Sequence, residues 1–188
     1  MNPSRQKNLI RLILAALFLA LALVLPFLTG QIQQFGNMLC PMHFPVLLCG
    51  FFCGPWLGLA VGFIAPLWRS LQFGMPQLFP VAVAMAFELA AYGFVAGLLY
   101  KLLPKKKIYV YVSLISAMLV GRLIWGLVRV IFYGVWESAF GWSAFFAGAF
   151  TNAIPGIVLQ LIIIPILVIT LTRLFPQLRE DQKDHIEK

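Results

Sequence analysis

Acidic side chains are scarce in this sequence. It contains 6 aspartates and glutamates in 188 residues, and only Glu88 falls within one of its long hydrophobic stretches. A lone carboxylate cannot form the acid and base pair that many hydrolytic enzymes use. The chain also lacks a Gly-x-Ser-x-Gly nucleophile turn and a P-loop. We therefore expect that it is not an enzyme, that it needs no cofactor, and that any ATP hydrolysis takes place in partner subunits.

Metal-binding residue types are equally sparse. The sequence has 2 histidines and 3 cysteines, and the cysteines Cys40, Cys49 and Cys53 lie in an apolar stretch. Cys49 and Cys53 share a helix face, but no histidine or carboxylate beside them completes a zinc set. We expect no metal site and interpret the cysteines as small apolar packing residues.

Charge of either sign is low, and the apolar content is high. Charged residues make up 11% and hydrophobic residues 62% of the chain, whereas soluble domains average about a quarter charged and about half apolar. The net charge of +8 comes from basic residues that gather beside hydrophobic stretches, at residues 5–11, 101–107 and 173–179. This is the positive-inside pattern of membrane proteins, so we expect a lipid bilayer as the surroundings and no nucleic-acid partner.

The hydrophobic stretches predict an all-α integral membrane protein, a bundle of six transmembrane helices with both termini cytoplasmic. Gly54-Pro55 and the segment 73–80 break the apolar region between the first two basic clusters, since proline stops helices and glycine permits turns. We expect a multi-pass protein of the cell (plasma) membrane, with residues 1–176 forming the membrane domain and 177–188 a polar cytoplasmic tail. The predicted spans are 9–28, 41–53, 56–72, 79–101, 108–133 and 142–174.

Charged residues inside these spans are costly, roughly 2.5 to 3.5 kcal/mol each at the centre of a membrane helix, and are therefore informative. Arg122 and Arg129 stand seven residues apart on one helix face with Trp125 between them, a face that suits an anionic ligand. One interpretation is structural: Arg122 pairs with Glu88 while Arg129 extends toward the membrane surface. The other is a bound anion, because three arginines, Arg69 included, face the single carboxylate Glu88. For Arg69, near the outer end of its span, extension to the surface is favoured over ligand contact.

Three further polar residues are candidate ligand contacts. Asn152 lies in the outer half of the last predicted span, and Asn37 and His43 belong to the external segment that precedes the second span. Asn152 and the deeper Gln160 alternatively bond a neighbouring helix. The segments 31–43 and 133–142 are predicted to cover a pocket from outside.

One run of the sequence, Pro41-Met-His-Phe-Pro-Val-Leu-Leu-Cys-Gly-Phe-Phe-Cys-Gly-Pro-Trp-Leu-Gly-Leu-Ala-Val-Gly-Phe63, resembles the substrate-binding (S) components of energy-coupling factor (ECF) transporters. The six-span layout and the pair Ala16-xxx-Ala20 add to this resemblance, which extends to about Pro176. It implies an outward-facing pocket for a vitamin or related micronutrient, and partners that comprise a transmembrane coupling protein and two ATPase subunits. It also implies that Ala16 and Ala20 dock to the coupling protein, although close packing within the chain is the default for such alanines.

The substrate and one rival function stay open at this stage. The excess of arginine favours a vitamin with a carboxylate, and the run Met42-His43-Phe44-Pro45 resembles pantothenate-type members, so pantothenate is the first expectation and riboflavin or another vitamin the next. The alternative is a membrane scaffold of the rod-shape-protein type that transports nothing. Such a scaffold would pair the Arg122 to Arg129 face fully within the protein.

Overall fold

The computed structural model describes residues 3–29, 39–104, 106–135 and 154–174. Every regular element within these ranges is helical. Two short elements, the 3₁₀ turn η1 (Leu25–Thr29) and the π-helical turn η2 (Leu78–Ala82), accompany longer α-helices. These helices are α1 (Pro3–Val24), α3 (His43–Cys53), α4 (Pro55–Phe73), α5 (Val83–Leu102), α6 (Lys107–Val135) and α8 (Ile154–Leu174).

The α-helices of the described ranges occupy the stretches predicted to span the membrane. Four helical stretches are long and apolar enough to cross a bilayer: Arg5–Leu28, Leu78–Leu102, Lys107–Phe132 and Ile154–Leu174. Helix α3 is apolar but only 11 residues long, whereas a bilayer core needs about 20 residues. The all-helical membrane fold is thus confirmed for the described part of the chain, and the count of six spans stays a prediction.

Proline and glycine set most helix boundaries. Gly54 has φ +95° between α3 and α4, and Pro55 is the first residue of α4, where its missing N–H costs nothing. At the other end of α4, Gly74 adopts the left-handed conformation with φ +68° and its N–H bonds the Ser70 carbonyl. The two predicted breaks are therefore both confirmed.

Two predicted boundaries agree with the helical stretches, although the helix type changes at proline. The fourth span was expected from residue 79, and its stretch begins at Leu78 with the turn η2, in which Phe79 before Pro80 is extended (φ −122°, ψ 134°), and continues as α5 from Val83. The first span was expected to reach residue 28, and its stretch does so because the turn η1, which contains Pro26, follows the end of α1 at Val24. For the last span, the described helix begins at Ile154, and residues 142–153 lie outside the described ranges.

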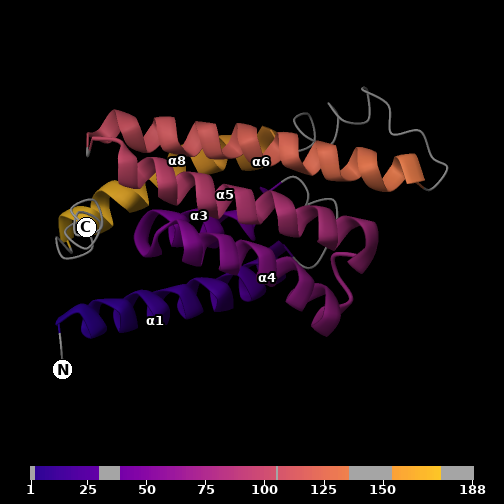
Figure 1. Ribbon diagram of the computed structural model, residues 1–188, viewed down its shortest axis with the longest axis horizontal. Coiled ribbons are helices and arrows are strands. Elements are labelled where there is room, and N and C mark those ends of the chain that lie inside the picture. The colour runs from indigo at the N-terminus through magenta and orange to yellow at the C-terminus, as the bar shows by residue number, and fades with distance from the viewer. Residues whose placement is uncertain (1–2, 30–38, 105, 136–153, 175–188) are drawn as a thin grey trace.

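The helices lie side by side along the long axis of the molecule (Figure 1), and α5 is central. It packs against α4, α6 and α3, while α1 covers α3 and α4 and α8 lies against α6 and α3. The apolar interior is built by side chains from all of these helices, including Phe51, Leu89, Leu114 and Ile164. Centrality explains why α5 is the most buried of the candidate spans.

Glycine allows α3, α4 and α5 to approach at backbone distance. A methyl group on Gly93 of α5 would overlap the Gly58 carbonyl of α4, and one on Gly97 would stand 2.7 Å from the Gly50 oxygen of α3. One on Gly58 would stand 2.8 Å from the Gly50 α-carbon. Small residues at such contacts are the usual means by which membrane helices associate. We call α3, α4 and α5 the glycine-packed trio.

The basic clusters gather at one end of the bundle. Helix α1 begins, α5 ends, α6 begins and α8 ends at this end (Figure 1), which brings together the residues near Arg5, Lys101, Lys107 and Arg173. This agrees with the predicted chain parity. Which side of the membrane this basic end faces stays a prediction, and the proposed tail 177–188 lies outside the described residues.

Candidate functional site

The carboxylate of Glu88 is buried between α5 and α6. Its side chain is 2% exposed, and its Oε1 lies 3.0 Å from Nη1 of Arg122 on α6. Arg122 as a whole is 6% exposed, so the carboxylate and the guanidinium are both shielded from solvent. Of the two interpretations left open by the sequence, the structural one included this Arg122–Glu88 ion pair, and the pair is present.

His43 brings a second nitrogen close to Glu88 from α3. It is the first residue of that helix and 3% exposed, and its Nε2 lies 3.6 Å from Glu88 Oε1. The His43 ring also meets Tyr92 edge to face, with ring centroids 5.2 Å apart. His43 was predicted as a site residue in an external segment, and the structure places it at the buried start of a helix.

Tyr92 was missed by the sequence reasoning. It stands four residues after Glu88 on α5, hence on the same helix face, and its side chain is fully buried. Its position relative to the only carboxylate of the spans was the available signal. A buried phenol normally finds a hydrogen-bond partner, which makes its neighbourhood informative.

The contacts of Cys40 differ from the packing role that was expected for it. It was interpreted as apolar packing, but Nη2 of Arg122 donates to its Sγ over 3.7 Å. Cys40 adopts a left-handed backbone conformation (φ +49°), uncommon for a residue with a side chain, and its carbonyl accepts from the His43 N–H at 3.0 Å. Cys49 and Cys53 are buried free thiols, as predicted. Within the described ranges, no three metal-ligating side chains lie together.

Cys40, His43, Glu88, Tyr92 and Arg122 form what we call the buried polar cluster. Several of its polar atoms are buried yet make no hydrogen bond of normal geometry within the described part of the chain, notably both His43 ring nitrogens and the Tyr92 hydroxyl. Gln160 on α8 is 1% exposed, and its amide nitrogen and oxygen likewise make no hydrogen bond of normal geometry within the described residues. Buried polar groups usually have hydrogen-bond partners, so these groups are able to bond a polar ligand.

Arg129 and Trp125 continue the site along α6. The Arg129 guanidinium lies over the Trp125 ring, 5.3 Å from the ring centroid, and both side chains are half-buried. A cation over an aromatic face is a favourable pairing. Trp125 and Arg129 follow Arg122 by about one and two helical turns on the same face, which agrees with the predicted stripe.

Arg69 departs from its expected position. Extension to the membrane surface was favoured, but Arg69 is 2% exposed, and its Nη1 donates to the Leu23 carbonyl at the end of α1. Its guanidinium also lies over the rings of Phe27 and Phe73, 4.7 and 5.2 Å from their centroids. The carbonyl groups at the end of a helix stabilise a cation, so the hydrogen bond from Arg69 stabilises the packing of α4 against α1.

Ala16 and Ala20 are exposed on α1, which contradicts packing within the chain as their role. The alanines that α1 buries are Ala15 and Ala22. Leu9 and Ile13, 47% and 59% exposed, continue the same face toward the start of the helix. The remaining site predictions, Asn37 and Asn152, lie outside the described residues.

Comparison with known proteins gives one family and no individual relative. No curated protein and no solved structure matches the chain. The family model described as "ECF transporter, substrate-specific component" matches residues 10–168, which include every helix that contributes to the buried polar cluster. The family consists of specificity subunits of transporters rather than enzymes. The chain therefore belongs to the substrate-specific components of ECF transporters.

Proposed function

We propose that this ECF substrate-specific component captures a vitamin or related micronutrient from outside the cell (plasma) membrane, and that the buried polar cluster contacts the ligand. The observation that carries the proposal is that, within the described part of the chain, buried polar atoms of His43, Tyr92 and Gln160 make no hydrogen bond of normal geometry. Each such group costs roughly 1 to 3 kcal/mol when unsatisfied, so a polar ligand that bonds them gains that amount. Family membership implies association with the ECF coupling protein and ATPases and a small-molecule substrate.

Charge balance favours a substrate with a carboxylate. Glu88 is the single carboxylate of the described ranges and pairs with Arg122, and Arg129 lies on the same face of α6 as Arg122. Arg69 bonds the Leu23 carbonyl at the end of α1, so the Arg122 to Arg129 face is the basic surface nearest the cluster. A carboxylate bound there forms charge-assisted hydrogen bonds. Pantothenate, which adds hydroxyl and amide groups suited to His43 and Tyr92, is our first substrate and riboflavin the second.

The substrate is tested by releasing small molecules from the purified, denatured protein for mass spectrometry and by titrating pantothenate and riboflavin into ligand-free protein. We expect Tyr92→Phe to weaken binding about tenfold, because it removes one buried hydroxyl and leaves the ring in place. Thr172→Val is the matched control: its hydroxyl bonds the Val168 carbonyl within α8, so binding should stay within about twofold of wild type. Stoichiometric riboflavin in place of pantothenate would reassign the substrate, and absence of binding by any vitamin would contradict the proposed capture.

We further propose that the exposed face around Ala16 and Ala20 docks to the coupling protein. Small side chains there let a partner helix approach closely. We expect Ala16→Leu to lower substrate uptake by the assembled transporter about tenfold, since overpacking a close helix contact costs roughly 1 to 3 kcal/mol. Substrate binding by the isolated subunit should be unchanged, because Ala16 does not face the bundle.

The control for this prediction adds bulk on another lipid-facing surface. Ile166 on α8 is 57% exposed, so Ile166→Phe should leave both uptake and binding near wild type. Uptake that survives Ala16→Leu would place the docking face elsewhere. The scaffold alternative is not favoured, since the family match is to a transporter subunit.

A further inference from the structure

Gln160 on α8 carries a buried amide that the described helices leave without a partner. Neither its Nε2 nor its Oε1 makes a hydrogen bond of normal geometry within the described part of the chain. A primary amide offers two donors and two acceptor lone pairs. Because buried polar groups that lack partners are costly and rare, this amide is suited to bond a group that enters from outside these helices.

The sequence of α8 turns this amide toward the interior of the bundle. Gly156, Gln160, Ile164 and Val168 follow one another at intervals of four residues, and all four are buried. Ile162, two residues from Gln160, is 53% exposed on the opposite side of the helix. Gln160 therefore belongs to the face of α8 that packs against α6 and α3.

Gln160 lies at the same level of the bundle as the buried ion pair. Glu88, Arg122 and Gln160 stand 14 or 15 residues from the ends of α5, α6 and α8 that lie at the basic end of the bundle. A helix rises about 1.5 Å per residue, so each of the three lies about 20 Å from that end. Since α6 is a direct neighbour of α8, the Arg122 guanidinium and the Gln160 amide enter one layer of the interior from adjacent helices.

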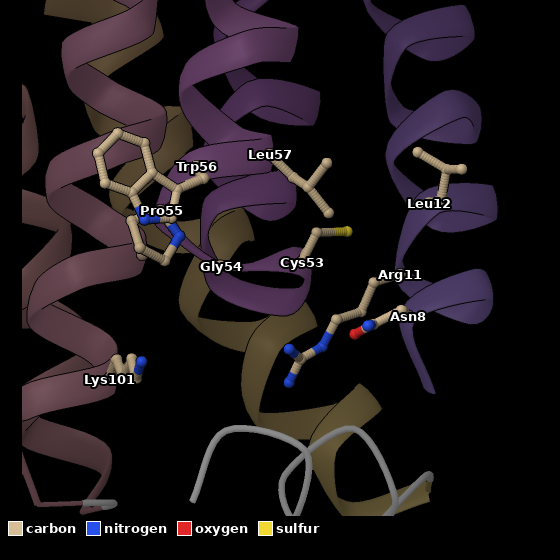
Figure 2. A pocket seen from close by; sticks show the side chains of 10 residues that line it. Asn8, Arg11, Leu12, Cys53, Gly54, Pro55, Trp56, Leu57 and Lys101 are labelled. Carbon is tan, nitrogen blue, oxygen red and sulfur yellow. The ribbon is translucent and has the colours of Figure 1, made fainter. Parts of the chain in front are cut away.

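The groove at the basic end of the bundle does not reach this amide. It has a volume of about 610 Å³ and opens between the start of α1, the turn from α3 to α4, and the end of α5, where Lys101 lies (Figure 2). No residue of α8 is among the described residues that line it. Glu88 lies 13 residues before Lys101, which is about 20 Å along the helix. Water in this groove is therefore too distant to bond Gln160.

The chemistry of an amide defines the ligand group that fits it. The nitrogen donates and the oxygen accepts along one edge, so a ligand group that presents an acceptor and a donor side by side bonds both. An imide presents its C=O and N–H in this way, and an α-hydroxy amide presents its C=O and its hydroxyl. The group should be neutral, because an amide has no charge with which to offset that of a buried ion.

We propose that Gln160 determines the specificity of the substrate site by pairing with a neutral substrate group in which a carbonyl acceptor and an O–H or N–H donor are adjacent. This inference rests on the proposed function, because it needs a substrate at the level of the buried polar cluster. A carboxylate of the substrate then lies toward Arg122 and the neutral group toward α8. Pantothenate carries an α-hydroxy amide and riboflavin an imide, so both named substrates have a group of this class.

Thermal unfolding of the ligand-free protein separates this role from a structural one. Gln160→Met removes the amide and keeps the length of the side chain, so we expect it to raise the unfolding midpoint by about 3 °C through the loss of an unsatisfied buried group. Ser113→Ala is the control: the Ser113 hydroxyl is fully buried but donates to the Tyr109 carbonyl, so its removal should not raise the midpoint. A midpoint at or below that of wild type in both Gln160→Met and the differently shaped Gln160→Leu would mean that the amide is bonded within the protein, which overturns the proposal.

Paired ligands test the specificity itself. Pantothenate is titrated beside its analogue without the hydroxyl next to the carbonyl, and riboflavin beside its derivative methylated on the imide nitrogen. We expect wild type to bind the parent compound about 30-fold more tightly than the analogue, which leaves the Gln160 oxygen unbonded. In Gln160→Met the preference should fall to about twofold or less, since the partner of the missing donor is gone, whereas Ser113→Ala should keep the wild-type preference.

The outcomes distinguish this inference from the proposed function. A vitamin that binds wild type without preference over its analogue, or a preference that survives in Gln160→Met, would overturn the role of Gln160 and leave vitamin capture in place. Failure of wild type to bind any vitamin would instead contradict the proposed function, and the role of Gln160 with it.

Discussion

Replacing Arg122 by alanine is expected to lower the free energy of unfolding by about 3 to 5 kcal/mol, the usual cost of breaking a buried ion pair from one side. The substitution leaves the Glu88 carboxylate buried with its closest cation gone, since Oε1 lies 3.0 Å from the guanidinium and the side chain is 2% exposed. The Cys40 thiol loses its donor as well. Unfolding in mixed detergent micelles, followed by circular dichroism, measures the loss.

A second substitution identifies the cause. Glu88→Gln in the Arg122→Ala background removes the uncompensated charge and should recover about half of the lost stability or more. Arg173→Ala, at an exposed arginine in the last turn of α8, should change stability by less than about 0.5 kcal/mol. A double variant no more stable than Arg122→Ala would show that the arginine stabilises the bundle through packing instead of charge.

Gly93→Ala is expected to have the largest effect of any single added methyl group, roughly 3 kcal/mol of destabilisation, at the upper end of the overpacking range. The new methyl overlaps the backbone of α4 at Gly58, and backbone cannot rotate away as a side chain can. Helices α4 and α5 must therefore separate. The same unfolding titration measures this change.

Val112→Ile is the matched control, because it also adds one methyl group. Val112 is 40% exposed on α6, so the extra methyl meets the detergent or lipid and should change stability by less than about 0.5 kcal/mol. Equal destabilisation by both variants would contradict the close approach of α4 and α5 in the folded protein.

Much of the fold was predictable because the signals are local. Long apolar stretches gave the helices, and Gly54-Pro55 and the 73–80 break gave the cuts between them. The change of helix type beside proline was not predicted: Phe79, before Pro80, is extended, so the turn η2 precedes α5, which begins at Val83. The close approach within the glycine-packed trio was not predicted. It depends on which glycines of different helices lie opposite one another, and a single sequence does not determine how the helices are aligned.

The site was predictable where one residue is chemically exceptional. Glu88 is the only carboxylate of the spans, so its pairing with Arg122 was one of the two interpretations that the cost of buried charge suggested. Cys40 and Arg69 were misplaced because their contacts join distant segments: Cys40 meets Arg122, and Arg69 meets the end of α1. Tyr92 stands four residues after Glu88, and this spacing is present in the sequence. It was not used because tyrosine is common in membrane helices and is informative here only through its nearness to Glu88.

The glycine-packed trio has a mechanical consequence. Where Gly50, Gly58 and Gly93 meet, the backbones interlock with no intervening side chain to rearrange, so the three helices cannot slide past one another without first separating. A force applied at α1, which packs on α3 and α4, is therefore passed to the whole trio instead of being absorbed between helices. Any tilting of the subunit within the bilayer would therefore move these three helices together as one rigid body.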